Sequence, residues 1–176
     1  MRKRTSFVIF IASLGMVVAL AGCGAGSEPS ITARAEADKV AMASADDAAM
    51  LQAFARAKGS LDAFLTRVAA KDPLVQEPLV KMKVQDGEAV EYFWIGSLTQ
   101  ESGGVTGIVK NDPELVHNIR DGQTIYFPRT QVFDWTYTDA NSGEMIGNYT
   151  ACALLTHETP SDAAEFRRTY HLDCDP

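Results

Sequence analysis

The alternation of apolar and polar residues is sharpest between Gly122 and Tyr137. It predicts two β-strands joined at residues 128–130, and in the second strand Phe133, Trp135 and Tyr137 occupy every second position. Alternate side chains of a strand point to the same face of a sheet, so we expect three aromatic rings on one face. Such a face must be buried against other elements, and the remaining pattern supplies them.

A long amphipathic helix is predicted to begin after Asp46 or Asp47, either of which is a typical N-cap, and to end at residues 71–73. Its larger apolar residues recur at steps of three and four, which is the period of one helix face. They are Met50, Leu51, Phe54, Leu61, Phe64, Leu65 and Val68. The stripe keeps its phase through Gly59, so we expect one continuous helix packed on a sheet.

Two strands, residues 79–85 and 88–96, follow the helix. They are joined by Asp86-Gly87, a dipeptide that strongly favours a β-hairpin. With these two as the loop residues, Met82 lies opposite Glu91, and Glu91 falls on the apolar face of the pair.

Both faces of the returning strand are largely apolar. One face is expected to join the core, and its residues are Val80, Met82, Val84, Ala89, Phe93 and Ile95, with Glu91 among them. The other face presents Val90, Tyr92 and Trp94. Only one long and one short helix are predicted to cover five or six strands, so part of the second face should stay exposed. Exposed contiguous apolar surface usually marks an interaction site, and the aromatic candidates for binding are Tyr92, Trp94 and Trp135.

The rest of the chain predicts shorter elements. Residues 105–110 form a short strand, residues 112–117 a helical turn, residues 144–155 a last strand, and residues 161–170 a short helix capped by Ser161 or Asp162. The whole pattern predicts an α+β fold: one long N-terminal helix packed on a curved antiparallel sheet of five to six strands, and a short C-terminal helix. A small, partly open barrel is the alternative form of this sheet.

Six motifs lie along these elements: VKMKV, EYFWIG, GIVKNDPE, DGQTIYF, VFDWTY and GNYTACALL. Their marker residues are Trp94, Gly107, Asn111, Pro113, Gly122, Asp134, Trp135, Gly147 and Thr150. Together they resemble the YegJ-type domain of unknown function found in bacteria. The resemblance covers about residues 47–155 and implies a small α+β domain, with no agreed activity. We expect this domain at residues 46–159, followed by a C-terminal helical tail at residues 160–176.

The N-terminus has a different pattern. Three cations at positions 2–4 precede an apolar run at residues 7–20, which is too short to span a bilayer comfortably, and Ala21-Gly22-Cys23 follows. Residues 1–22 resemble a bacterial lipoprotein signal peptide, which implies cleavage before Cys23 and acylation of that residue. An ordinary secretory signal or a short membrane anchor is the alternative. Residues 23–45 are rich in small and polar residues and are expected to form a flexible tether.

Cleavage would leave 154 of the 176 residues, which is enough for one domain, and would change the formal net charge from −7 to −10. An acidic chain is repelled by nucleic acid, so we expect no nucleic-acid partner, and membrane contact through the lipid alone. The expected location is the cell envelope, facing the periplasm, and Gly24 implies by resemblance the outer membrane of a Gram-negative host.

Disulfides persist in the periplasm. We therefore expect Cys152 and Cys174 to form a disulfide that stabilises the domain by roughly 3 kcal/mol.

Motifs for a metal, a cofactor or a nucleophile are absent from the sequence. His117, His157 and His171 are far apart, and neither a glycine-rich phosphate loop nor a GxSxG motif occurs. We therefore expect no metal and no cofactor. Glu91 and Asp134 are the candidate catalytic residues, since a carboxyl group in apolar surroundings has a raised pKa, as general acids do. The alternatives are a salt bridge or an outward orientation for Glu91, and a backbone-capping role for Asp134.

Three functions remain open from the sequence. The favoured one is a non-catalytic envelope lipoprotein that binds an envelope protein or a cell-wall polymer. The second is a hydrolase or transferase, which requires Glu91 and Asp134 to meet in one cleft. The third is an immunity lipoprotein that neutralises a toxin delivered into the periplasm, because an acidic surface would attract a basic toxin.

Overall fold

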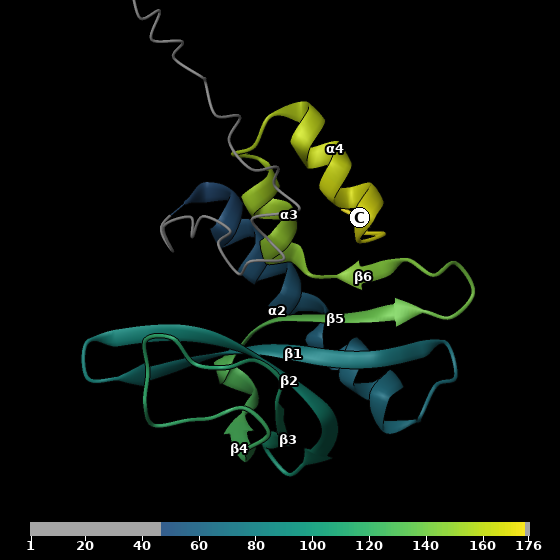
Figure 1. Ribbon diagram of the computed structural model, residues 1–176. Coiled ribbons are helices and arrows are strands. Elements are labelled where there is room, and N and C mark those ends of the chain that lie inside the picture. Colours follow the sequence, from purple (N-terminus) through teal and green to yellow (C-terminus); the bar gives the residue numbers. More distant parts are fainter. Residues whose placement is uncertain (1–46, 175–176) are drawn as a thin grey trace, which may run out of the picture.

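The computed structural model describes residues 47–174. This part of the chain contains three α-helices, a 3₁₀ turn and one antiparallel sheet of six strands, as Figure 1 shows. In chain order these are α2 (Ala48–Ala69), β1 (Val75–Asp86), β2 (Ala89–Glu101), β3 (Gly104–Val109), β4 (Thr124–Pro128), η1 (Arg129–Gln131), β5 (Val132–Asp139), β6 (Met145–Gly147), α3 (Tyr149–Leu155) and α4 (Pro160–Thr169). The predicted α+β class is confirmed. The signal peptide, Cys23 and the tether lie outside the described residues.

The sheet is strongly curved but not closed into a barrel. Its strand order is β4-β3-β2-β1-β5-β6, so four steps separate β4 from β5. In a flat sheet these steps would span roughly 19 Å. The two strands are joined by η1, only three residues long, and a connection from Pro128 to Val132 reaches at most about 14 Å. The sheet must therefore curl, and it does so around the apolar side of α2.

Helix α2 begins as predicted. The side chain of Asp47 accepts hydrogen bonds from the backbone N–H groups of Ala49 (2.9 Å) and Met50 (3.1 Å). The buried side of the helix differs from the predicted one. Leu51 is 53% exposed, whereas Ala53 and Ala57, which were not predicted to be buried, are buried. Ala57 lets Trp135 of the sheet approach the helix backbone closely, whereas Ala53 packs beside Ala153 of α3.

Trp135 lies in the core formed by α2 and the sheet. Its indole stacks on Phe64 with ring centroids 4.7 Å apart, and its Nε1–H donates to the carbonyl oxygen of Ala57 at 3.1 Å. It is 5% exposed. The expectation that Trp135 shares a binding surface with Tyr92 and Trp94 is therefore not met.

A bulge in β5 also separates the three predicted rings. Lys81 pairs with Asp134, whereas the next residue of β1, Met82, pairs with Val132, so Phe133 is the extra residue. The ring of Phe133 consequently leaves the line of Trp135 and Tyr137, which stack with Phe64, and meets Phe54 and Tyr92 edge-on.

The β1–β2 hairpin turns one residue later than predicted. Asp86 pairs with Ala89, so Gly87 and Glu88 are the loop residues, and Val84 rather than Met82 lies opposite Glu91. A positive φ of +60° at Gly87 suits the first loop position of such a turn. The partners change by two residues, and side chains alternate with a period of two, so every residue keeps its predicted face.

The predicted last strand at residues 144–155 is wrong. The chain forms β6 only as far as Gly147 and then α3, after Gly147 (φ +86°) and Asn148 (φ +47°) turn it through the left-handed region. Helix α4 then begins at Pro160, capped by Thr159 rather than by Ser161 or Asp162.

The cysteine pair lies where a disulfide requires it, with the Cα atoms of Cys152 and Cys174 5.6 Å apart and the sulfur atoms at bonding distance. The link joins the end of the chain to α3 rather than to a strand.

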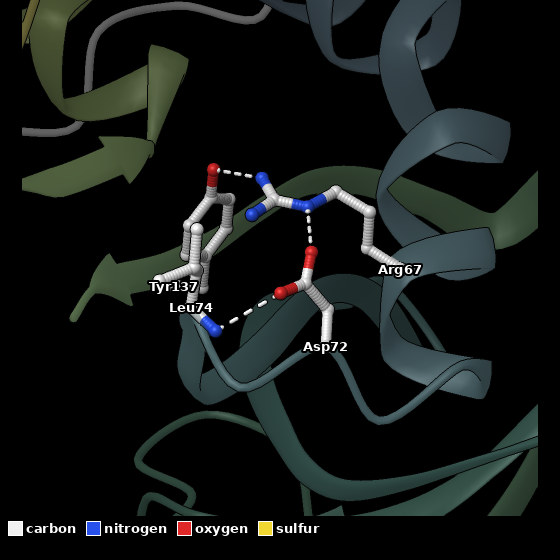
Figure 2. A network of polar contacts seen from close by, with 4 residues as sticks. All are labelled: Arg67, Asp72, Leu74 and Tyr137. Atoms are coloured by element: carbon white, nitrogen blue, oxygen red, sulfur yellow. Dashed lines mark hydrogen bonds and ion pairs between the residues drawn. The ribbon is translucent and has the colours of Figure 1, made fainter. Parts of the chain in front are cut away.

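A polar network fixes the C-terminal end of α2 against the sheet (Figure 2). Arg67 Nε donates to Asp72 Oδ2 at 2.8 Å, Arg67 Nη1 donates to the hydroxyl of Tyr137, and Asp72 Oδ1 accepts from the backbone N–H of Leu74 at 3.0 Å. The hydrogen bond from Arg67 lowers the pKa of Asp72. The network joins α2, the turn before β1 and β5, and it has a structural role.

Within residues 47–174, no helix is both long enough and apolar enough to cross a bilayer.

Gly59 gives a prediction that tests the packing of α2. A Cβ atom built there meets nothing within 4 Å, so alanine fits without strain. Because alanine favours a helix and restricts the unfolded chain, Gly59→Ala should raise the free energy of unfolding by roughly 0.5–1 kcal/mol, measured by urea denaturation. Gly122→Ala is the control: its surroundings are equally open, but its φ of +71° should make the same change destabilising. A loss of stability in Gly59→Ala would contradict the helix environment described here.

Candidate functional site

The described helices cover one face of the sheet only in part, at its β5 side, where Thr150 of α3 contacts Lys81 and Asp134. Helix α2 packs on the opposite face, against residues such as Val80 and Phe93, and α3 packs on α2 and the β5 edge. On the partly covered face, Lys81 lies directly across from Trp94 and Lys83 from Tyr92. We call this surface the lysine–aromatic face and define it by Lys81, Lys83, Tyr92, Trp94, Lys110 and Tyr126. All six side chains are at least partly accessible to solvent.

Lys110 and Tyr126 belong to this face by register and by contact. A Cβ atom at Gly96 would lie 2.8 Å from Lys110 Cε and 2.9 Å from Leu79 Cδ2, so the lysine stem crosses the sheet over this glycine. Tyr126 pairs with Thr106 on β3 and is 55% exposed. The face therefore extends from β1 to β4.

Lys81 is held in place on three sides. Its Nζ lies 4.3 Å from the ring centroid of Trp94 and donates to Thr150 Oγ1 at 2.6 Å. Asp134 lies opposite it on β5. Burial lowers the pKa of the Lys81 ammonium, and the charge of Asp134 partly opposes this. The ammonium and the indole thus form one cation–π unit in a fixed position.

Asp134 is fully buried and acts as the cap of α3. Its carboxylate accepts from the backbone N–H of Trp135 (2.9 Å), Tyr149 (3.2 Å) and Thr150 (2.8 Å), and from the Thr150 hydroxyl (2.6 Å). Asn148, at the N-cap position, makes no side-chain capping bond. Asp134 thus caps backbone N–H groups, which was the alternative to a catalytic role. The helix that it caps had been predicted as a strand.

Glu91 binds the loop between β3 and β4. Its carboxylate accepts from the backbone N–H groups of Glu114 (3.0 Å), Leu115 (2.9 Å) and Val116 (3.3 Å). These N–H groups were predicted to start a helical turn, and that prediction is wrong, because residues 112–117 form an irregular loop that the carboxylate holds through these groups. Burial raises the pKa of Glu91, but the three N–H donors together outweigh this and lower it. Neither alternative considered for Glu91, a salt bridge or an outward orientation, describes this arrangement.

The same loop is fixed at further points. Asp86 accepts from the His117 N–H at 2.8 Å, Asn118 Nδ2 donates to the carbonyl of Gln85 at 2.8 Å, and Asn111 Oδ1 accepts from the Trp94 N–H at 2.9 Å. Val116 is buried in the main core. The loop therefore closes one end of that core, and its Asn111 fixes the backbone of Trp94 through the hydrogen bond given above.

The two candidate catalytic carboxylates are not brought together. Glu91 is opposite Val84 and points to the α2 side of the sheet, whereas Asp134 is opposite Lys81 and belongs to the other side. Both are fully engaged by backbone donors. A single cleft containing both groups, which the enzyme alternative requires, is not formed.

Sequence reasoning missed the role of Thr150, which bridges Asp134 and Lys81. Its position just after the turn residues Gly147 and Asn148 was the available signal for a helix start. Among residues 47–174 no cluster of three or more His, Cys, Asp or Glu side chains could hold a metal ion.

A family model described as "Uncharacterized protein conserved in bacteria (DUF2314)" matches residues 47–174. The chain belongs to this family. The uncharacterized protein YegJ of Escherichia coli (strain K12) is 30% identical over 122 residues, which cover 69% of this chain and 77% of that protein.

A second relative is larger. A putative ankyrin repeat protein of Neisseria meningitidis serogroup B (NMB1133/NMB1171) is 24% identical over 89 residues, which cover 51% of this chain and 34% of that protein. No solved structure gives a significant match. The DUF2314 match includes α4 and the segment up to Cys174, so the C-terminal elements belong to the family domain.

The contacts of Glu91 predict a pH dependence. Glu91→Gln should lower the free energy of unfolding by roughly 1–3 kcal/mol at pH 7, because it removes charge-assisted bonds to three N–H groups. The pKa of Glu91 is lower in the folded state, so its stabilisation is complete above the unfolded carboxyl pKa of about 4.3 and is lost as the pH falls through the folded value. The difference between wild type and variant should therefore shrink below about pH 4.

Urea denaturation at several pH values, with hydrogen exchange of amides 114–116, measures this effect. Glu88→Gln is the matched control, since Glu88 is exposed in the turn of the same hairpin. Equal effects of the two variants at pH 7 would contradict the role given to Glu91.

Proposed function

We propose that this protein is a lipid-anchored, non-catalytic binding protein of the cell envelope, and that its lysine–aromatic face contacts an anionic cell-wall polymer. The observation that carries the proposal is the face itself: paired lysines and aromatic rings on a sheet surface that stays partly accessible to solvent beside its contact with α3. Such a surface is typical of a binding site, not of a covered core.

The charge of the face supports an anionic partner. The whole chain carries a formal charge of −7, yet this face presents Lys83 and Lys110 to solvent, beside Lys81, whose ammonium is buried against Thr150 and Trp94. Asp134, the acidic residue behind it, is fully buried, and Glu101, at its margin, is hydrogen-bonded to Thr106. A basic toxin would be repelled by these lysines, so the face favours a cell-wall polymer over the immunity role.

The aromatic residues support a polymer that contains sugar rings. Trp94, Tyr92 and Tyr126 are partly exposed to solvent, and the apolar faces of sugars can stack on aromatic rings. Carboxylate groups of the same polymer would pair with Lys83 and Lys110, the two more accessible lysines of the face. No catalytic step is proposed, since Glu91 and Asp134 lie on different sides of the sheet.

The lipid anchor rests on the sequence Leu20-Ala21-Gly22-Cys23, outside the described residues. Two or more acyl chains at Cys23 would hold the domain stably at a membrane, most simply the outer membrane of a Gram-negative host, where the tether places it within reach of the cell wall. Mass spectrometry of the membrane fraction tests the anchor. Recovery of an unmodified protein from an osmotic-shock fluid would overturn it.

Sedimentation with purified peptidoglycan sacculi tests the binding face. Trp94→Ala and Lys83→Ala should each weaken co-sedimentation about tenfold, the effect of a central contact residue. Lys58→Ala is the control for Lys83→Ala, because Lys58 is an exposed lysine on α2, away from the face. Chitin, an uncharged sugar polymer, should bind less than sacculi. Unchanged binding by Trp94→Ala, with an unchanged melting temperature, would refute the proposal.

A further inference from the structure

A second candidate site lies between the three helices, away from the lysine–aromatic face. At one end of the molecule the first part of α2 lies beside α3, with α4 close to α3 (Figure 1), and residues of all three helices line an open pocket of about 340 Å³. Ala53, Ala153 and Ala163, one from each helix, are buried and line it. Because these side chains are small, the helices leave space that larger residues would fill. The Cys152–Cys174 pair forms part of the wall.

Two arginines from different helices line the same pocket. Arg56 of α2 places its guanidinium 4.6 Å from the ring centroid of Tyr149, and Arg167 comes from the last turn of α4. Both side chains are exposed, and within residues 47–174 neither is paired with a carboxylate. Arg67 and Arg129, by contrast, each have an aspartate partner. Two guanidinium groups that have no acidic partner among the described residues, beside an apolar floor, favour an anion that also has an apolar part.

We propose that this pocket binds a small amphipathic anion. The carboxylate or phosphate group of the ligand would lie between Arg56 and Arg167, since guanidinium groups bind both in bidentate fashion. Its apolar part would pack on the alanine floor. The pocket volume is at the lower end of the range for small-molecule sites, so it suits a ligand of the size of one substituted ring, not a polymer. This site is independent of the proposed cell-wall contact.

Ligand-observed NMR titration of the full-length protein in lipid nanodiscs tests the proposal, with empty nanodiscs as the blank. The probes are benzoate, phenyl phosphate and uncharged benzyl alcohol. We expect one or both anions to bind, and benzyl alcohol to bind about tenfold more weakly or not at all, since it cannot form the charged hydrogen bonds. Benzoate and phenyl phosphate distinguish a carboxylate from a phosphate site.

Variants locate the binding. Arg56→Gln and Arg167→Gln should each weaken binding of the preferred anion about tenfold. The controls are Lys58→Gln on α2 and Arg168→Gln on α4, which remove a charge from the same helices at exposed positions outside the pocket. Ala163→Leu should abolish binding by filling the space, and melting temperatures check that each variant folds. Absence of binding by both anions, equal binding of benzyl alcohol, or equal losses in the control variants would overturn the proposal.

Discussion

Asp134→Ala is expected to lower the free energy of unfolding by about 3–5 kcal/mol, the cost of removing one partner from a buried charge network. The carboxylate accepts from the N–H groups of Tyr149 and Thr150 and from the Thr150 hydroxyl, and it faces the buried ammonium of Lys81. Alanine would leave the backbone donors without a partner and would remove the negative charge that offsets the burial of the Lys81 ammonium. The conservative change Asp134→Asn should cost at least about 2 kcal/mol, because an amide brings an N–H donor against donors.

Thermal and urea denaturation measure both variants, and Asp139→Ala is the matched control. Asp139 is in the same strand and also accepts from backbone N–H groups, at Asn141 and Ser142, but these bonds are exposed to solvent. Its removal should cost only about 1 kcal/mol. In the double variant Lys81→Met/Asp134→Ala, the unpaired charge is absent, so part of the lost stability should return. A cost for Asp134→Ala no larger than that for Asp139→Ala would refute the buried network.

Gly147→Ala is expected to cost roughly 3–5 kcal/mol, from a left-handed backbone and a steric clash together. Gly147 has a φ of +86°, and a Cβ atom there would lie 2.3 Å from the carbonyl oxygen of Trp135. That oxygen belongs to the backbone of a core strand and accepts from the Asn148 N–H, so it cannot move away easily.

Gly143→Ala separates the two causes. Gly143 has a similar φ of +73° but nothing within 4 Å of a Cβ atom, so it should show only the backbone cost of about 1–2 kcal/mol. Urea denaturation of both variants gives the comparison. Equal losses would mean that the approach of Gly147 to Trp135 contributes nothing.

Asp134 and Gly147 connect the core to the candidate site. The turn at Gly147 and Asn148 brings the start of α3 to Asp134, and Thr150 of α3 then holds Lys81 over Trp94. Damage to the turn should therefore also disturb the lysine–aromatic face. We therefore expect Gly147→Ala to bind sacculi more weakly than Gly143→Ala. The comparison is made at a temperature where both variants are folded.

Local pattern was enough for the elements whose burial follows their own period. The helix from Ala48 to Ala69 was predictable because apolar residues recur on one side and Asp47 caps it. The faces of β1 and β2 were predictable because side chains alternate, and the error of two residues in pairing left the faces unchanged. The lysine–aromatic face could thus be predicted around Trp94 and Tyr92. The pairing of these rings with Lys81 and Lys83 across the two strands was not predicted.

Tertiary structure decided the remaining features, because each depends on a partner that is distant in sequence. Residues 149–155 were assigned to a strand, yet they form a helix, and Asp134, 15 residues earlier, satisfies the first N–H groups of that helix. Glu91 was recognised as a carboxylate on an apolar face, but the donors that hold it lie in a loop that follows β3. Trp135 was predicted on a binding surface, but its pairing with Val80 and its contacts with Ala57 and Phe64 of α2 place it in the core. A local pattern shows at which intervals apolar residues recur along the chain. Hydrogen-bond partners and bulges, by contrast, are fixed only when the strands pair.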